Sequence, residues 1–188
     1  GSEVEGYAVA FTKAEEQPYG VFSDFHQRNL VYNGMTFKSA ACVLAYMKVE
    51  CEREGTSPDE TREKIKDLDE KQAELQKCTG WKAKILTGKD EFTMKNDGEW
   101  KKKEQKVMRK VLKLKFDQDG QARELLMSTH PRPIEFKING KWGSLSSKGS
   151  GKGGSKGGGK GKRPREDENN LYGKALMALR ALYMTKAK

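Results

Sequence analysis

Residues 30–55 read LVYNGMTFKSAACVLAYMKVECEREG, and this stretch decides the fold of the first half of the chain. Apolar residues on both sides of Asn33-Gly34 predict a β-hairpin, because this pair tolerates the positive φ angles of a tight two-residue turn. Ser39 is a favourable helix N-cap. The residues after it have the i, i+3, i+4, i+7 spacing of a buried helical stripe: Ala40, Val43, Leu44 and Met47. We therefore expect two short strands followed by a helix that ends at Gly55.

Helices dominate the rest of the predicted secondary structure. The expected elements are a weak strand in Tyr7–Phe11, an exposed charged helix within Pro58–Lys77, amphipathic helices over Trp100–Phe116 and Gln121–Ser128, and a strand over Ile134–Ile138. Asn169 or Asn170 is expected to cap a last helix that turns its apolar side to the core: Leu171, Ala175, Leu176, Leu179 and Leu182. This pattern predicts a mainly α (α+β) fold with a small β element, in one compact domain over residues 1–188.

The net charge of +10 is concentrated in one segment. Residues 148–165 hold seven basic and no acidic residues, and residues 146–162 are all Gly, Ser or Lys. This composition cannot bury apolar surface, so we expect 146–165 to be a disordered insertion. It is either a solvated loop or a basic arm that contacts phosphates.

Other features exclude several classes of protein. Three cysteines and two histidines without metal-ligand spacing indicate no metal site, no disulfide framework and no cofactor. The absence of a long apolar run predicts no membrane span, and the free cysteines favour an intracellular protein, cytoplasmic or nuclear. Gly1-Ser2 is typical of the remnant of an affinity tag.

The sequence resembles the NADAR (YbiA-like) family over almost its whole length. The matching pieces occur in the family's order: Tyr19-Gly20, Phe22-Ser23-Asp24-Phe25, Gly34, Phe37-Lys38-Ser39, Lys48, Trp100, Val107-Met108, Lys115-Phe116, Leu125-Leu126 with Thr129, Glu135, Trp142-Gly143, Asn170 to Met177, and Arg180. The resemblance implies a compact helical domain, here expected to be a monomer, that cleaves N-glycosidic bonds. Members are associated with removing ADP-ribose from guanine bases of nucleic acid, and some with hydrolysing riboflavin-pathway intermediates.

The chain departs from the family pattern at sensitive positions. Ala41 stands where the family has a glutamate after the motif serine, so the expected acid is missing. Asn139, a further catalytic candidate, replaces an aspartate three residues before Trp142-Gly143. Asp24 replaces an asparagine, and Gly88-Lys89 replaces a glycine-arginine pair, with Lys89 expected to bind substrate. Either the chain diverged into a binding module, or an engineered Glu→Ala change traps a substrate; we favour the second explanation.

Position 41 and Lys48 are expected to act together. Seven residues bring an α-helix back to nearly the same face about 10 Å further along, and Ala45 between them is small. A glutamate at 41 would stabilise the oxocarbenium-like transition state and handle the proton of the departing base. Lys48 is the candidate for a Schiff base with the opened ribose.

The remaining candidates are expected to bind substrate. Ser23, Asp24 and Phe25 lie near the hairpin, where the oxygens are suited to ribose, although Phe22 and Phe25 are equally core candidates. Trp142 is expected to stack on a base beside Gly143. Asn170 is expected to cap the last helix and to contact the ligand, although capping alone explains it equally well. Gly173 permits a close approach of backbone or ligand, and the N-terminus of this helix suits a diphosphate. Lys115 and Arg180 either neutralise phosphates or are surface charges.

The predicted function is thus release of ADP-ribose from ADP-ribosylated guanosine, as nucleoside or in nucleic acid, impaired by Ala41. The alternatives are a hydrolase of riboflavin-pathway intermediates, a catalytically dead ADP-ribose reader, and a basic interaction module.

Overall fold

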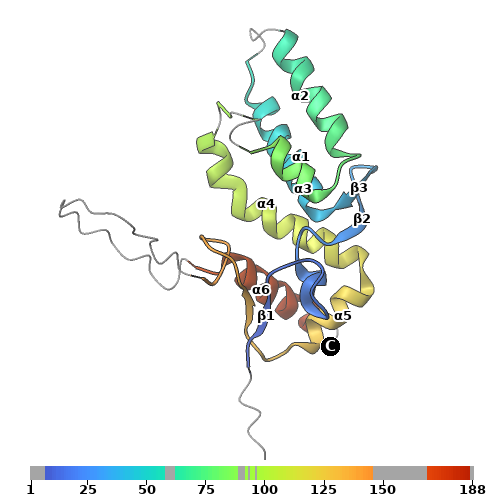
Figure 1. The fold of residues 1–188 in the computed structure, drawn as a ribbon, viewed down its shortest axis with the longest axis vertical. Helices are drawn as coiled ribbons and strands as arrows, with labels where there is room; N and C mark the ends of the chain where they lie inside the picture. Colours follow the sequence, from blue (N-terminus) through green and yellow to red (C-terminus); the bar gives the residue numbers. More distant parts are fainter. Residues whose placement is uncertain are drawn as a thin grey trace, which may run out of the picture. The chain divides into compact units, whose positions relative to one another are not determined.

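The computed structural model describes residues 7–57, 62–88, 92, 94–95, 97–145 and 169–186 (Figure 1). Gly1-Ser2, Lys89 and the insertion expected at 146–165 lie outside these residues. Contacts divide the chain into two compact units, one formed by Lys13–Leu125 and the other by the described parts of Gly1–Thr12 and Leu126–Lys188.

The first unit contains the predicted hairpin. Strand β2 (Gln27–Tyr32) pairs antiparallel with β3 (Met35–Ser39), and Tyr32 faces Met35 across the turn. Asn33 and Gly34 have φ angles of 49° and 75°, the positive values that a type I′ turn requires. The hairpin prediction is therefore confirmed.

Helix α1 (Ala40–Glu54) follows β3 directly and forms the centre of this unit. The Ser39 side chain accepts a hydrogen bond from the Cys42 N–H, 3.4 Å, and Gly55 ends the helix, as predicted. Around α1 pack α2 (Arg62–Leu75), α3 (Gly80–Leu86) and α4 (Asp97–Gln118). A short 3₁₀ helix, η1 (Tyr19–Phe22), precedes the hairpin. The short α3 was not predicted.

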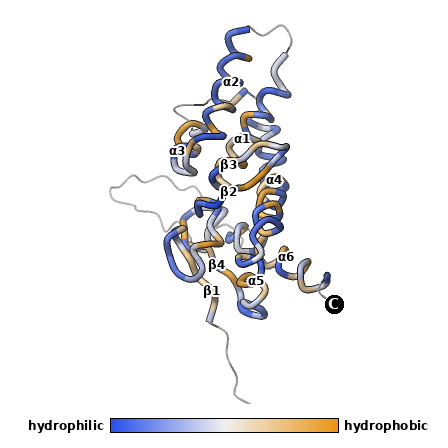
Figure 2. The backbone as a smooth tube through the Cα atoms, turned by 90° about the vertical axis from the view of Figure 1, so that its right-hand side faces the viewer, coloured by the Kyte–Doolittle hydropathy of each residue, from blue (hydrophilic) through white to orange (hydrophobic). Residues whose placement is uncertain are grey.

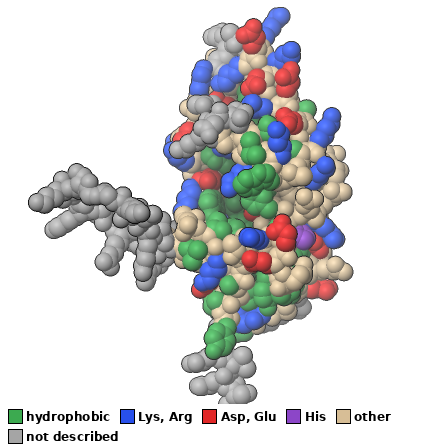
Figure 3. All heavy atoms as spheres, viewed as in Figure 1, with side chains coloured by type: hydrophobic (Ala, Val, Ile, Leu, Met, Phe, Trp, Pro, Cys, Tyr) green, Lys and Arg blue, Asp and Glu red, His purple; other side chains and the backbone are tan. Residues whose placement is uncertain are grey.

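Helix α2 matches the expected exposed charged helix. It buries Leu68, Gln72 and Leu75, while most of its length is hydrophilic (Figure 2). Acidic and basic side chains alternate over the part of the surface formed by this helix (Figure 3). Ion pairs such as Lys66–Glu70 join successive turns, and exposed pairs of this kind contribute little to stability.

The second unit brings segments from near both ends of the chain together around β4. Strand β1 (Val9–Phe11) lies parallel to β4 (Ile134–Phe136), and α6 (Leu171–Lys186) packs on β4. Phe11 stacks on Phe136 at 4.8 Å between ring centroids, and Tyr172 of α6 lies 4.9 Å from Phe136. Helix α5 (Gly120–Ser128) crosses the boundary between the units.

The buried side of α6 differs in part from the prediction. Ala175, Leu176 and Leu179 are buried as expected, but Leu182 is 39% exposed and Tyr183 takes the next buried position. The stripe continues from Leu179 by four residues instead of three, which turns Leu182 to the surface. The mainly helical fold with a small β element is nevertheless confirmed.

Candidate active site

Position 41 lies in the first turn of α1, where three segments of the first unit meet. Ala41 is 7% exposed, and its N–H donates a hydrogen bond to the Asp24 carbonyl, 2.9 Å. Gly80, the first residue of α3, has no side chain here; a Cβ on it would lie 2.9 Å from Ser39 Oγ and 3.2 Å from the Ala41 Cβ. Gly80 therefore packs closely against Ser39 and Ala41, where a larger residue would have to displace its neighbours.

Lys48 lies two turns further along the same side of α1, and Ala45 between them is buried. The Lys48 Nζ donates to the Thr87 carbonyl, 2.6 Å, and lies 5.9 Å from the centre of the Phe92 ring. Partial burial lowers the pKa of Lys48 because it disfavours the charged form, while Asp97 and Glu104 oppose this effect. A lysine with a lowered pKa is a better nucleophile at neutral pH.

The Ser23–Phe25 turn precedes the hairpin and contacts the start of α1. Ser23 is buried, and its Oγ accepts a hydrogen bond from the Phe25 N–H, 3.2 Å. Phe22 belongs to the core, whereas Phe25 is half-buried with Lys84 Nζ 5.9 Å from its ring centre. Asp24 is buried too, and burial raises the pKa of its carboxyl group, against the opposing charge of Lys115.

Lys115 is a buried cation, not a surface charge. Only 1% of it is exposed, and its Nζ donates to the Ser23 carbonyl. Burial lowers the pKa of Lys115 to about 8, although Asp24 and Asp119 favour the charged form. The amine thus holds the backbone of the turn that carries Asp24, and the surface alternative for Lys115 is wrong.

In the second unit, the Trp142-Gly143 loop meets the start of α6. Three successive N–H groups, of Asn170, Leu171 and Tyr172, donate to the carbonyls of Gly143, Lys141 and Trp142 at 2.7, 3.1 and 3.2 Å. These protein acceptors already satisfy the amides that were expected to suit a diphosphate. Trp142 is half-buried, with Lys141 Nζ 5.5 Å from its ring centre.

Asn170 and Gly173 fasten α6 to β4. The Asn170 side chain accepts from the Phe136 N–H, 3.1 Å, and donates to the Ile134 carbonyl, 2.8 Å. A Cβ on Gly173 would overlap that same Ile134 oxygen. The close approach at Gly173 is therefore an approach of protein backbone.

Asn139 and Arg180 have different surroundings in the second unit. Asn139 is exposed and forms an isolated β-bridge with Leu145. Arg180 is buried, and its guanidinium donates to the Thr129 hydroxyl and the Arg132 carbonyl, each at 2.8 Å. The surface alternative for Arg180 is wrong as well, since the residue joins α6 to the segment after α5.

The structure thus places the candidates in two groups. Ser23, Asp24, Phe25, Ala41 and Lys48 belong to the first unit; Asn139, Trp142, Gly143, Asn170 and Gly173 belong to the second. Gly80 was missed because its role depends on contact with α1. The burial of Lys115 and Arg180 could have been predicted from the sequence, because each occupies a position in an apolar helical stripe.

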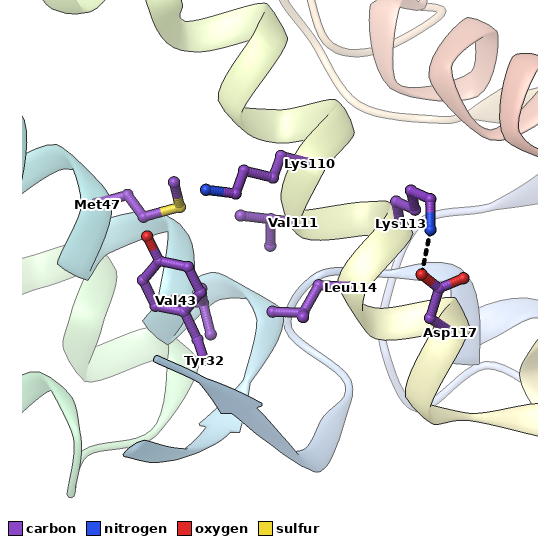
Figure 4. A pocket seen from close by; sticks show the side chains of 8 residues that line it. All are labelled: Tyr32, Val43, Met47, Lys110, Val111, Lys113, Leu114 and Asp117. Carbon is purple, nitrogen blue, oxygen red and sulfur yellow. Dashed lines mark hydrogen bonds and ion pairs between the residues drawn. The ribbon is translucent and has the colours of Figure 1, made fainter. Parts of the chain in front are cut away.

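The opposite face of α1 borders a separate pocket of about 210 Å³ (Figure 4). At about 100° per residue, Val43 and Met47 point away from the side that carries Ala41 and Lys48. The other lining residues come from β2 and α4: Tyr32, Lys110, Val111, Lys113, Leu114 and Asp117. Its interior is mostly apolar, which does not suit a diphosphate-linked sugar.

Comparison with known families settles the identity of the fold. The family model described as NADAR domain matches residues 10–183. The chain belongs to the NADAR family. This NADAR chain also resembles a solved structure, the NMR structure of the E. coli protein YbiA, with 22% identity and a TM-score of 0.62. The match covers 97% of this chain and 88% of YbiA. No curated protein in the comparison matches the chain.

NADAR domains are in general glycosidase-like, which is compatible with N-glycosidase chemistry. Among the described residues, no cluster of acidic, histidine or cysteine side chains has the arrangement of a metal site. None of the helices described in this NADAR chain has the length and apolar character needed to span a membrane.

Proposed function

We propose that this NADAR protein is an N-glycosidase that releases ADP-ribose from ADP-ribosylated guanine, as nucleoside or in nucleic acid, and that Ala41 impairs it. One observation carries the proposal: Ala41 and Lys48 lie two turns apart on the same side of α1. Ala41 is buried there, and partial burial lowers the pKa of Lys48. The proposal includes an intracellular, monomeric protein that needs no cofactor.

A carboxylate at position 41 would act on the bond between ribose and the guanine nitrogen. Cleavage of this bond develops positive charge at the anomeric carbon, which a nearby carboxylate stabilises while it activates water. Ala41 has only a methyl group and can do neither.

Lys48 would act on the ring-opened form of the ribose. Its neutral amine adds to the imine carbon, both of its protons pass to the guanine nitrogen, the carbon–guanine nitrogen bond breaks to release the guanine amine, and a lysine Schiff base remains. Water then hydrolyses the Schiff base, which releases ADP-ribose and regenerates the amine. The lowered pKa supports this step because only the neutral amine is nucleophilic.

The binding roles are assigned to polar and aromatic groups of each unit. Asp24 and Ser23 adjoin the start of α1 and are proposed to hold the ribose side, with Phe25 beside them. Trp142 is proposed to stack on a base, with Gly143, Asn170 and Gly173 shaping its loop. Lys89 is proposed as a further substrate contact and Asn139 as a further catalytic residue.

The test is restoration of the missing acid. The Ala41→Glu variant and the unchanged protein are incubated with an oligonucleotide that carries ADP-ribosylated guanosine, and free ADP-ribose is measured. Ala41→Gln is the matched control, because it fills the same space without an acid. Release by Ala41→Glu alone is expected; release by Ala41→Gln at the same rate, or by none of the three, would contradict the proposal.

Lys48 is tested in the same background. Borohydride should trap the substrate on the Ala41→Glu variant and not on the variant that also carries Lys48→Met. Trapping that persists without Lys48 would assign the Schiff base to another amine.

The presence of Ala41 favours one second candidate, a reader that binds ADP-ribose without cleaving it. This alternative predicts tight binding of ADP-ribose and no turnover after Ala41→Glu. If the Ala41→Glu variant releases no ADP-ribose from the oligonucleotide but cleaves a riboflavin-pathway intermediate, the result would instead support the small-molecule hydrolase.

A further inference from the structure

A β-bulge in the hairpin gathers four polar side chains around an open groove. Gln27 pairs with Ser39 and Leu30 with Phe37, so Arg28 and Asn29 together face the single residue Lys38. Such a bulge leaves its extra residue outside the ladder and redirects the side chains. Gln27, Arg28 and Asn29 are consequently all exposed, in place of the alternation seen further along β2.

These residues line a groove of about 570 Å³, and among the described residues its lining side chains are all polar or charged. Arg28 is held in place by an ion pair of its Nε with Asp119, 3.4 Å, and the Asp119 side chain is 3% exposed. Within the described residues, neither Nη group of Arg28 makes a hydrogen bond and Lys38 has no ion-pair partner. The groove therefore presents two cations and two amide side chains, Gln27 and Asn29, to solvent.

The groove borders the end of the strand that leads into α1. Gln27 pairs with Ser39, the residue that caps α1, and β3 continues into α1 without a break (Figure 1). A ligand in the groove would thus lie beside the segment that leads to position 41. Arginine and lysine charges with amide donors are the groups that proteins use to bind phosphodiester oxygens.

We infer that the bulge groove binds the phosphodiester backbone of a nucleic-acid strand next to the modified guanine. The inference rests on the proposed function and narrows its substrate to a polynucleotide. The diphosphate of ADP-ribose has the same phosphate chemistry and is the competing occupant. Measuring the affinity of the same variants for an oligonucleotide and for free ADP-ribose distinguishes the two phosphate ligands.

The experiment compares the full chain with its Arg28→Gln/Lys38→Gln variant. Binding of a fluorescent single-stranded oligonucleotide is followed by anisotropy from 0.05 to 0.5 M NaCl, and ADP-ribose binding by calorimetry. Loss of two phosphate contacts on a single strand should lower the salt slope by about 1.4 and the affinity about 20-fold at 0.1 M salt. The affinity for ADP-ribose should stay within about twofold of the parent. The basic residues of 148–165 are the same in both proteins and cancel in the difference.

Two further variants keep the result decisive. Lys66→Gln/Lys102→Gln removes the same charge from the exposed surfaces of α2 and α4 and should change affinity less than about threefold. Lys38→Gln alone preserves the Arg28–Asp119 pair and should lower the salt slope by about 0.7.

Three outcomes would overturn the inference: an unchanged oligonucleotide affinity, an equal loss in the control pair, or an equal loss for ADP-ribose. The last would assign the groove to the diphosphate. The binding assay needs no turnover. Inactivity of the Ala41→Glu variant would therefore refute the glycosidase proposal and leave the groove assignment intact, and an unchanged oligonucleotide affinity would refute the groove assignment and leave the glycosidase proposal intact.

Discussion

Replacing Asn170 with alanine is expected to lower the free energy of unfolding by about 2 to 4 kcal/mol. The Asn170 amide pairs with the Phe136 N–H and the Ile134 carbonyl, both of buried residues. A buried backbone group left without a partner costs about 1 to 3 kcal/mol. Asn170 also has a φ of 58°, a left-handed conformation that costs alanine about 1 kcal/mol and asparagine less.

Urea unfolding of the Asn170→Ala, Asn170→Gly and Asn169→Ala variants separates these effects. Glycine removes the hydrogen bonds without backbone strain, so Asn170→Gly should be the more stable of the two Asn170 variants by about 1 kcal/mol. Asn169→Ala is the matched control, because within the described residues its side chain makes no hydrogen bond. The melting temperature of Asn170→Ala should fall by about 5 to 15 °C.

A different result would change the assignment of Asn170. A loss of less than about 0.5 kcal/mol together with weaker ADP-ribose binding would show that the side chain serves the ligand and that the contact to β4 contributes little.

Further predictions concern three other positions. Gly80→Ala should lower the free energy of unfolding by about 1 to 3 kcal/mol, because the added methyl group crowds Ser39 Oγ and the Ala41 Cβ. Urea unfolding measures the effect, and a change below about 0.5 kcal/mol would contradict the close packing at Gly80. The Lys115 amine should titrate near pH 8 in NMR spectra of the folded protein, against 10.5 for an ordinary lysine. Since the unfolded state then binds more protons between these values, this group makes stability rise with pH over that window, and a Lys115 titration near pH 10.5 would refute its burial. Thr129→Val should cost about 1 to 3 kcal/mol in urea unfolding, because Arg180 loses one acceptor while it keeps the Arg132 carbonyl; a change below 0.5 kcal/mol would mean that this contact is dispensable.

Local signals in the sequence predicted the hairpin and α1 correctly. The Asn33-Gly34 turn and the Ser39 cap act through atoms a few residues apart, so their structural consequences are visible in a short stretch of sequence. Helical periodicity also located α4 and α6, although it placed Leu182 on the buried side.

The burial of Lys115 could be predicted from the sequence only in part. Lys115 follows Met108, Val111 and Leu112 at helical spacing, which is the position of a core residue. The sequence could therefore have indicated burial, but not the acceptor, because the Ser23 carbonyl lies 92 residues away along the chain.

The sequence alone determined the hairpin, the longer helices and the family, and it placed the candidate positions 41 and 48 on one helix, whereas the short α3 was not predicted. Tertiary structure alone decided that β1 pairs with β4, that Gly80 lies against Ala41, and that Asn170 binds β4. The physical reason is the distance along the chain between the interacting groups. Turns, caps and helical stripes are set by neighbouring residues, whereas strand pairing, close packing and buried charge depend on segments that meet only after folding.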